Sequence, residues 1–67
     1  MTAKQIRALR RAYGRMAGIK DMTQAVFAAV IPTTVTTVSR WERGERSPRG
    51  LHLHRLQEMQ KIAKARS

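Results

Sequence analysis

The chain has 67 residues and a net charge of +10, because 14 Lys and Arg side chains outnumber four Asp and Glu. So short a chain buries only about 60% of its unfolded surface, and without cysteine it forms no disulfide framework. No apolar run approaches the roughly 18 residues that span a bilayer, and no signal peptide is visible behind the N-terminus. We expect a small intracellular domain that binds a polyanion. Nucleic acid is the first candidate for this partner, and an anionic membrane is the second.

The charges leave a neutral centre between two basic flanks. Residues 1–22 hold six basic side chains against one acidic, and residues 40–67 hold eight against three, whereas residues 23–39 hold none of either sign. A surface that reads DNA bases must approach them closely, with cations around it for the phosphates. This layout fits such a surface.

The first expected helix covers residues 4–13. Its apolar side chains recur at helical spacing: Ile6, Leu9 and Tyr13. Thr2 is placed to cap its start, and Gly14 to end it. Residues 14–22 are ambiguous, because Gly14 and Gly18 favour a loop whereas the apolar residues between them can continue a helix.

The second expected helix covers residues 23–31. Thr23 is a suitable N-cap, and Pro32 ends the helix. The apolar side chains form one stripe: Phe27, Val30 and Ile31.

Residues 33–43 carry conflicting signals. Four threonines and two valines favour a strand. The apolar residues, however, fall three apart: Val35, Val38 and Trp41. Thr34 can cap a helix and Gly44 can end it, so we expect a helix.

Residues 45–50 read as a loop, with Ser-Pro and Gly. Residues 51–66 are helical by pattern, with one apolar face: Leu53, Leu56, Met59 or Gln60, and Ala63. The expected fold is therefore all-α, a compact cluster of four to five short helices in one domain over residues 1–67. Its helix-turn-helix covers about residues 23–43, and its C-terminal helix about residues 50–65.

Two short helices joined by a tight turn form a helix-turn-helix, whose second helix lies in the DNA major groove. The exposed first-turn side chains of that helix would be Val35, Thr36 and Thr37, whose methyl and hydroxyl groups suit base edges. Arg40 lies one turn further on, and Arg bidentate to guanine is the commonest specific base contact. We expect these four residues to contact bases.

The run TQAVFAAVIPTTVTTVSRWERG resembles the helix-turn-helix of lambda-repressor-like regulators of the Cro/cI and XRE type. Gln24 stands where that family opens its second helix with Gln, and Ala28 where a small residue lets the helices cross. Other residues take its apolar core positions: Phe27, Ile31, Val38 and Trp41. The resemblance extends from Ile6 to Met59.

The resemblance implies roles for further residues. Gln24 would hold a DNA backbone phosphate or a neighbouring base. Thr34 would cap the recognition helix and help to bind a phosphate. The basic residues that follow this helix would hold phosphates or reach toward the minor groove: Arg43, Arg46 and Arg49. Arg10 and Glu42 match a structural ion pair that ties the recognition helix to the first helix.

The sequence departs from the family pattern at three places. Pro32 replaces the usual turn Gly and cannot supply a positive φ, so the turn must take another shape. Thr33 replaces a small apolar residue. Residues 15–21 resemble an insertion, so either the first helix is longer or a basic loop contacts the DNA backbone through Arg15 and Lys20.

No set of residues indicates an enzyme, a metal site, a cofactor or a small-molecule ligand. Ser39 and Ser47 have no base and orienter beside them, and on a helix His52 and His54 would point to different faces. We therefore interpret the chain as a sequence-specific regulator that binds double-stranded DNA in the cytoplasm, on the nucleoid.

We expect a repressor of bacterial, phage or mobile-element origin, which occludes a palindromic operator as a homodimer. Autoregulation is an inference from the family. The C-terminal stripe is either only a fourth wall of the core or, in part, the dimer contact: Leu53, Leu56, Met59 and Ile62. The principal alternative is an antitoxin that binds DNA and a toxin protein. A membrane-active peptide and a nonspecific chromatin-like binder are further alternatives.

Overall fold

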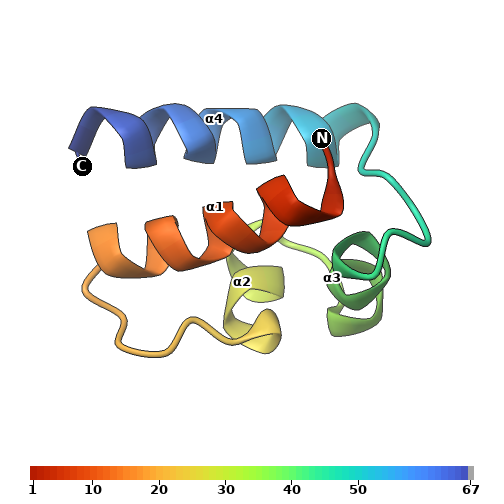
Figure 1. The fold of residues 1–67 in the computed structure, drawn as a ribbon, viewed down its shortest axis with the longest axis horizontal. Helices are drawn as coiled ribbons and strands as arrows, with labels where there is room; N and C mark the ends of the chain where they lie inside the picture. The colour runs from red at the N-terminus through yellow and green to blue at the C-terminus, as the bar shows by residue number, and fades with distance from the viewer. Residues whose placement is uncertain (67) are drawn as a thin grey trace.

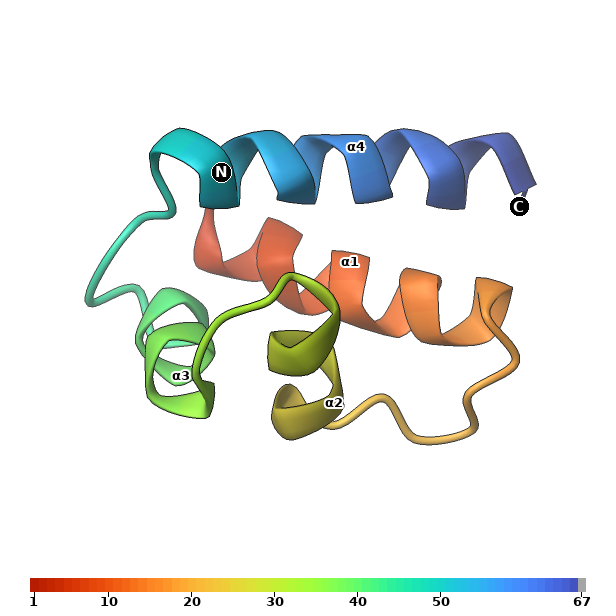
Figure 2. The same cartoon turned by 180° about the vertical axis from the view of Figure 1, so that it is seen from behind.

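The computed structural model describes residues 1–66, which form four α-helices and no strand. The helices are α1 (Ala3–Met16), α2 (Gln24–Val30), α3 (Val35–Glu42) and α4 (Gly50–Arg66). α1 and α4 run side by side in the same direction, and α2 and α3 lie on the other side of α1 (Figures 1 and 2). The predicted all-α fold with a helix-turn-helix is confirmed, with four helices in the described chain.

α1 begins as expected and ends later. The Thr2 hydroxyl accepts the Gln5 amide N–H at 3.1 Å, and the Gln5 side chain accepts the Thr2 N–H at 2.8 Å. The expectation that Gly14 ends the helix is wrong, because α1 continues to Met16 with Gly14 buried inside it. The left-handed residue that follows the helix is Gly18, at φ +73°.

The ambiguity over residues 15–21 has a mixed outcome. Arg15 and Met16 complete α1, and a loop at residues 17–22 leads to α2. The extra length relative to the family pattern is therefore part helix and part loop.

α2 and α3 start at the caps that the sequence predicts. The Thr23 hydroxyl accepts the Val26 N–H, and the Thr34 hydroxyl accepts the Thr37 N–H, both at 3.2 Å. Such a cap contributes about 1 kcal/mol, which matters for helices of seven and eight residues.

The turn between α2 and α3 accommodates Pro32 without a left-handed residue. The Ile31–Pro32 peptide bond is cis, and among the described residues only glycines have positive φ. The Thr33 N–H donates to the Ala28 carbonyl at 2.6 Å and closes the turn.

All four helices contribute to one core. Its buried apolar side chains are Ile6, Leu9, Met22, Phe27, Ala28, Ile31, Val38, Trp41, Leu56, Met59 and Ala63. Residues 33–43, where strand propensity and helical spacing disagree, contain the helix α3. The three-residue spacing turns both Val38 and Trp41 into the core. Burial of these two side chains outweighs the weak strand preference of the threonines.

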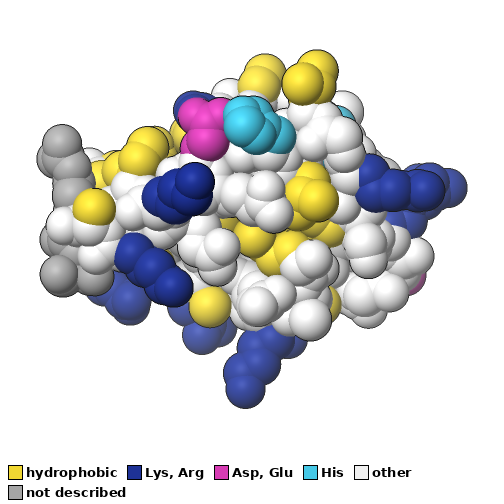
Figure 3. Space-filling model, turned by 90° about the horizontal axis from the view of Figure 1, so that it is seen from above, with side chains coloured by type: hydrophobic (Ala, Val, Ile, Leu, Met, Phe, Trp, Pro, Cys, Tyr) yellow, Lys and Arg dark blue, Asp and Glu magenta, His cyan; other side chains and the backbone are white. Residues whose placement is uncertain are grey.

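The apolar side chains of α4 are not all buried in the core. Leu56 and Met59 are fully buried and Leu53 is half-buried, but Ile62 is 41% exposed and Leu51 is 85% exposed. Viewed from the α4 side, hydrophobic side chains appear near the middle and along one edge of the surface (Figure 3). Lys and Arg side chains lie mostly at the opposite edge and at one end.

Candidate nucleic-acid interface

The outward side of α3 holds the predicted base-contacting residues. Since Val38 and Trp41 turn into the core, Val35, Thr36 and Arg40 are left exposed to solvent. Val35 is 45% exposed, although its side chain is apolar. The exposed side of α3 therefore presents small side chains at its start and one long cation a turn later.

Thr37 differs from the other three. It is half-buried, and its hydroxyl lies 2.9 Å from the Thr34 hydroxyl. This hydroxyl pair belongs to the N-cap of α3, so the Thr37 side chain has less freedom to read a base edge than Thr36 has.

A basic hollow lies between α3 and the loop that follows it. It has a volume of about 330 Å³, and its lining comes from both segments and from the start of α4: Thr37, Arg40, Trp41, Arg46, Ser47, Arg49 and His52. The hollow thus brings together three of the cations singled out in the sequence. A negatively charged backbone is the ligand class that suits such a lining.

The loop around this hollow is held by backbone hydrogen bonds. The Arg40 carbonyl accepts the N–H groups of Glu45 at 2.9 Å and Arg46 at 3.4 Å, after the left-handed Gly44. Pro48 is buried, and the His52 ring meets the Trp41 ring edge-on at 5.5 Å. The position of Arg46 is therefore tied to the recognition helix.

Arg43 is placed differently from Arg46 and Arg49. Its guanidinium forms an ion pair with Glu45 at 2.7 Å, and both side chains are more than half exposed. Exposed pairs contribute only about 0–1 kcal/mol, so a phosphate can replace Glu45 at little cost.

The two residues expected to hold phosphates at helix starts are both accessible. Gln24 is the first residue of α2 and is half-buried, and Thr34 is exposed at the start of α3. The Thr34 hydroxyl already accepts the Thr37 N–H and shares a hydrogen bond with the Thr37 hydroxyl, so one further hydrogen-bonding position remains for a ligand.

Arg10 and Glu42 are brought together at the back of α3. The guanidinium donates twice to the carboxylate, at 2.8 and 2.9 Å, and the Glu42 side chain is only 5% exposed. Arg10 also donates to the Met22 carbonyl at 2.7 Å, and Arg7 donates to the Glu42 carbonyl. These two further bonds were not predicted from the sequence, since a backbone carbonyl leaves no pattern in it. Together the bonds fix the C-terminal end of α3 against α1.

A model of the helix-turn-helix family matches residues 19–65, which is more than half of the chain. This chain belongs to the lambda-repressor-like, XRE-type helix-turn-helix family. No curated protein and no solved structure matches it. As a member of this family, the protein is a DNA-binding transcription regulator, and such regulators are typically not enzymes.

Two kinds of feature are absent from residues 1–66. No helix there is both long and apolar enough to cross a membrane. No three side chains of His, Cys, Asp or Glu gather there in a way that could hold a metal ion.

Proposed function

We propose that this XRE-type regulator is a sequence-specific repressor that binds a palindromic operator as a homodimer and blocks access of the polymerase. The observation that carries the proposal is the orientation of α3. Val38 and Trp41 fix the helix against the core, and Val35, Thr36 and Arg40 face outward beside a basic hollow. An outward helix start with short side chains and one arginine suits the major groove.

Each outward residue has a proposed role. Val35 and Thr36 contact thymine methyl groups or base edges, Thr37 supports them, and Arg40 donates to a guanine. The remaining cations and helix starts hold the DNA backbone: Gln24, Thr34, Arg43, Arg46 and Arg49. Base contacts then set specificity, and backbone contacts set register and most of the affinity.

The proposal of a homodimer rests on the small size of the reading surface. A helix-turn-helix dimer reads two half-sites about 34–36 Å apart, and the symmetry of the operator mirrors that of the protein. The exposed Leu51 and Ile62 on α4 are apolar surface that a second copy can cover. The regulator would work in the cytoplasm, on the nucleoid, and its own promoter is a natural operator.

The deciding experiment is a selection from a random duplex library, followed by fluorescence anisotropy at about 150 mM salt. We expect the selected site to bind at least about 10³-fold more tightly than a scrambled duplex of equal length. Sedimentation of the complex should give two protein chains per duplex, and the selected site should be an inverted repeat.

The matched variant is Arg40→Ala. Loss of the guanine contact should remove about 1–3 kcal/mol of discrimination and leave binding to scrambled DNA nearly unchanged. Selection that returns no preferred sequence would leave a nonspecific, charge-driven binder. A preferred site that Arg40→Ala reads equally well would contradict the assignment of α3.

The antitoxin alternative has one observation in its favour. A hollow of about 350 Å³ lies between α1 and α4, and its lining combines apolar with polar side chains: Ala8, Leu9, Ala12 and Ala63 with Gln5, Arg15, Gln60 and Lys64. A toxin protein could occupy it. Stable co-purification of one defined protein from the native cell, released by Ala12→Glu, would favour this role over that of a stand-alone repressor.

A further inference from the structure

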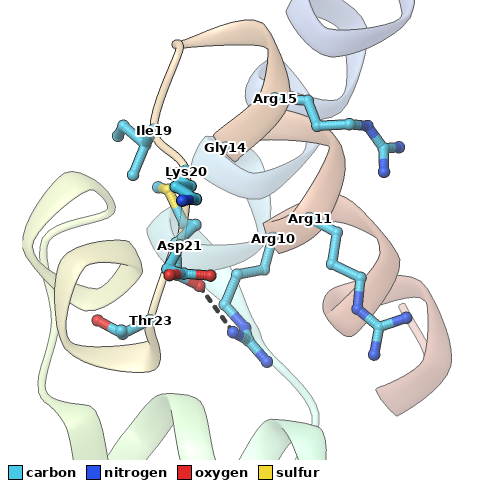
Figure 4. Close-up of a pocket in the computed structure, with 9 residues that line it drawn as sticks. Arg10, Arg11, Gly14, Arg15, Ile19, Lys20, Asp21 and Thr23 are labelled. Carbon is cyan, nitrogen blue, oxygen red and sulfur yellow. Dashed lines mark hydrogen bonds between the residues drawn. The ribbon is translucent and has the colours of Figure 1, made fainter.

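A second basic hollow lies at the other end of the helix-turn-helix, between α1 and the loop at residues 17–22. It measures about 590 Å³ and opens to solvent. Figure 4 shows the residues that line it. Its lining residues come from the C-terminal half of α1 and from the loop up to the cap of α2: Arg10, Arg11, Gly14, Arg15, Ile19, Lys20, Asp21, Met22 and Thr23. Four cations and one carboxylate therefore surround it.

The shape of this hollow is fixed by contacts between the loop and α1. The Ile19 N–H donates to the Gly14 carbonyl at 2.8 Å, and the Gly18 N–H donates to the Arg15 carbonyl at 3.2 Å. Met22 is buried in the core, and its carbonyl accepts a hydrogen bond from the Arg10 guanidinium at 2.7 Å. The backbone of the loop is thus held at both of its ends, which fixes where Lys20 and Asp21 branch from it.

Three of the four cations are available to a ligand. Arg10 is occupied by Glu42 and Met22, whereas the side chains of Arg11, Arg15 and Lys20 form no hydrogen bond or ion pair within residues 1–66. All three are exposed, and Asp21 is the one acidic side chain in the lining. The hollow therefore keeps an excess of positive charge.

This hollow adjoins the start of α2 and, through Arg15, also the hollow between α1 and α4. The loop at residues 17–22 sits with α2 and α3 on the side of α1 that faces away from α4 (Figures 1 and 2). Its last lining residue, Thr23, directly precedes Gln24, which we propose holds a backbone phosphate. A DNA strand that passes Gln24 can therefore continue into this hollow.

We propose that this hollow is a second DNA-backbone site, in which Arg11, Arg15 and Lys20 hold phosphates that flank the half-site read by α3. This inference rests on the proposed function. Arg11 and Arg15 extend from α1 while Lys20 extends from the loop, so the three cations do not converge on one point (Figure 4). Cations spread in this way suit successive phosphates of a strand, since a single small anion needs convergent donors.

At this site the protein would contact DNA that flanks the half-site, without recognising the sequence of that DNA. Phosphate contacts position a protein and raise its affinity but carry no direct sequence information. We therefore expect affinity and salt dependence to rise with flanking DNA of any sequence, while the preference for the half-site stays the same.

The test uses the selected operator in two lengths, the core site alone and the core site with a few flanking base pairs on each side. The protein variants are Arg15→Gln/Lys20→Gln and, as a control, Lys61→Gln, which removes one exposed lysine from the outer face of α4. Thermal unfolding of each variant checks that the fold is retained.

The slope of log affinity against log salt should fall by about 0.9 for each phosphate that a variant no longer binds, hence by about 2 for the double variant. Its deficit relative to wild type should then shrink about tenfold between 50 and 200 mM salt. The double variant, which keeps Arg11, should gain less from the flanks than wild type gains, and neutral methylphosphonate linkages there should weaken wild type more than the double variant. Lys61→Gln should behave as wild type.

The two possible failures can be told apart. If wild type prefers the operator but the double variant keeps its salt slope and its gain from flanking DNA, the second site is wrong and the proposed function stands. The same conclusion follows if Lys61→Gln, allowing for its single charge, matches the double variant, because net charge alone would then explain the weaker binding. If wild type shows no sequence preference, the proposed function itself fails, and this inference fails with it.

Discussion

Gly14 lies so close to Met22 that a Cβ atom at position 14 would sit 2.7 Å from the Met22 Cβ. Replacing an interior helix glycine by alanine normally stabilises a helix by about 1 kcal/mol. Here the atom in the way is the rigid first carbon of a buried side chain, so the backbone must move. We predict that Gly14→Ala destabilises the protein by about 1–3 kcal/mol in urea unfolding.

The control for this prediction is the exposed Ala8 in the same helix. Ala8→Gly reports the propensity effect alone and should cost about 1 kcal/mol. A stabilising effect of Gly14→Ala would mean that the loop at residues 17–22 does not pack on α1 as described.

Removal of the Glu42 carboxylate tests how much the Arg10–Glu42 ion pair contributes to stability. Glu42→Ala leaves the guanidinium of Arg10 without its partner in a largely buried position, and breaking a buried pair in this way costs about 3–5 kcal/mol. Because Arg10 remains 20% exposed and keeps its bond to Met22, we expect the lower end of this range. Such a loss would lower the melting temperature by roughly 12 °C or more for a domain of this size.

Glu45 supplies the matched comparison, since it pairs with Arg43 at a similar distance but on the surface. Glu45→Ala should change the unfolding free energy by less than about 1 kcal/mol. Equal effects of the two substitutions would show that burial does not distinguish these ion pairs.

Thr34 combines a cap with a proposed phosphate contact, and two substitutions separate these roles. Thr34→Ala removes the cap and should cost about 1 kcal/mol of stability together with some DNA affinity. Thr34→Asp keeps the cap but brings a negative charge to the phosphate, so we expect near wild-type stability with DNA binding weaker than in Thr34→Ala. Urea unfolding and anisotropy measure the two effects; recovery of both properties in Thr34→Asp would argue against a phosphate at this position.

Arg46 and Arg49 should behave differently from Arg40, although all three line one hollow. If they hold phosphates, Arg46→Ala and Arg49→Ala weaken binding to operator and scrambled DNA alike and each lower the salt slope by about 1. The ratio of the two affinities should stay constant. A fall in that ratio for either variant would reassign the arginine to base reading.

Local signals determined much of this protein from the sequence alone. The Thr23 and Thr34 caps could be predicted because a capping hydroxyl bonds an N–H only three residues away, and Pro32 and Gly44 mark helix ends by their own backbone preferences. The three-residue spacing of Val38 and Trp41 was enough to orient the recognition helix. The residues of the helix-turn-helix could thus be named before their positions were known.

Contacts between distant segments decided the rest. Whether Gly14 ends a helix or lies inside one depends on Met22, which approaches it only after the chain has turned back, and short-range preference cannot register that contact. Three further features likewise depend on how the segments meet in space. Arg40, Arg46 and Arg49 line one hollow, Arg43 pairs with Glu45, and the loop that carries Lys20 is held against α1. Residue spacing determined which side chains could serve DNA binding, and tertiary packing decided where each of them lies.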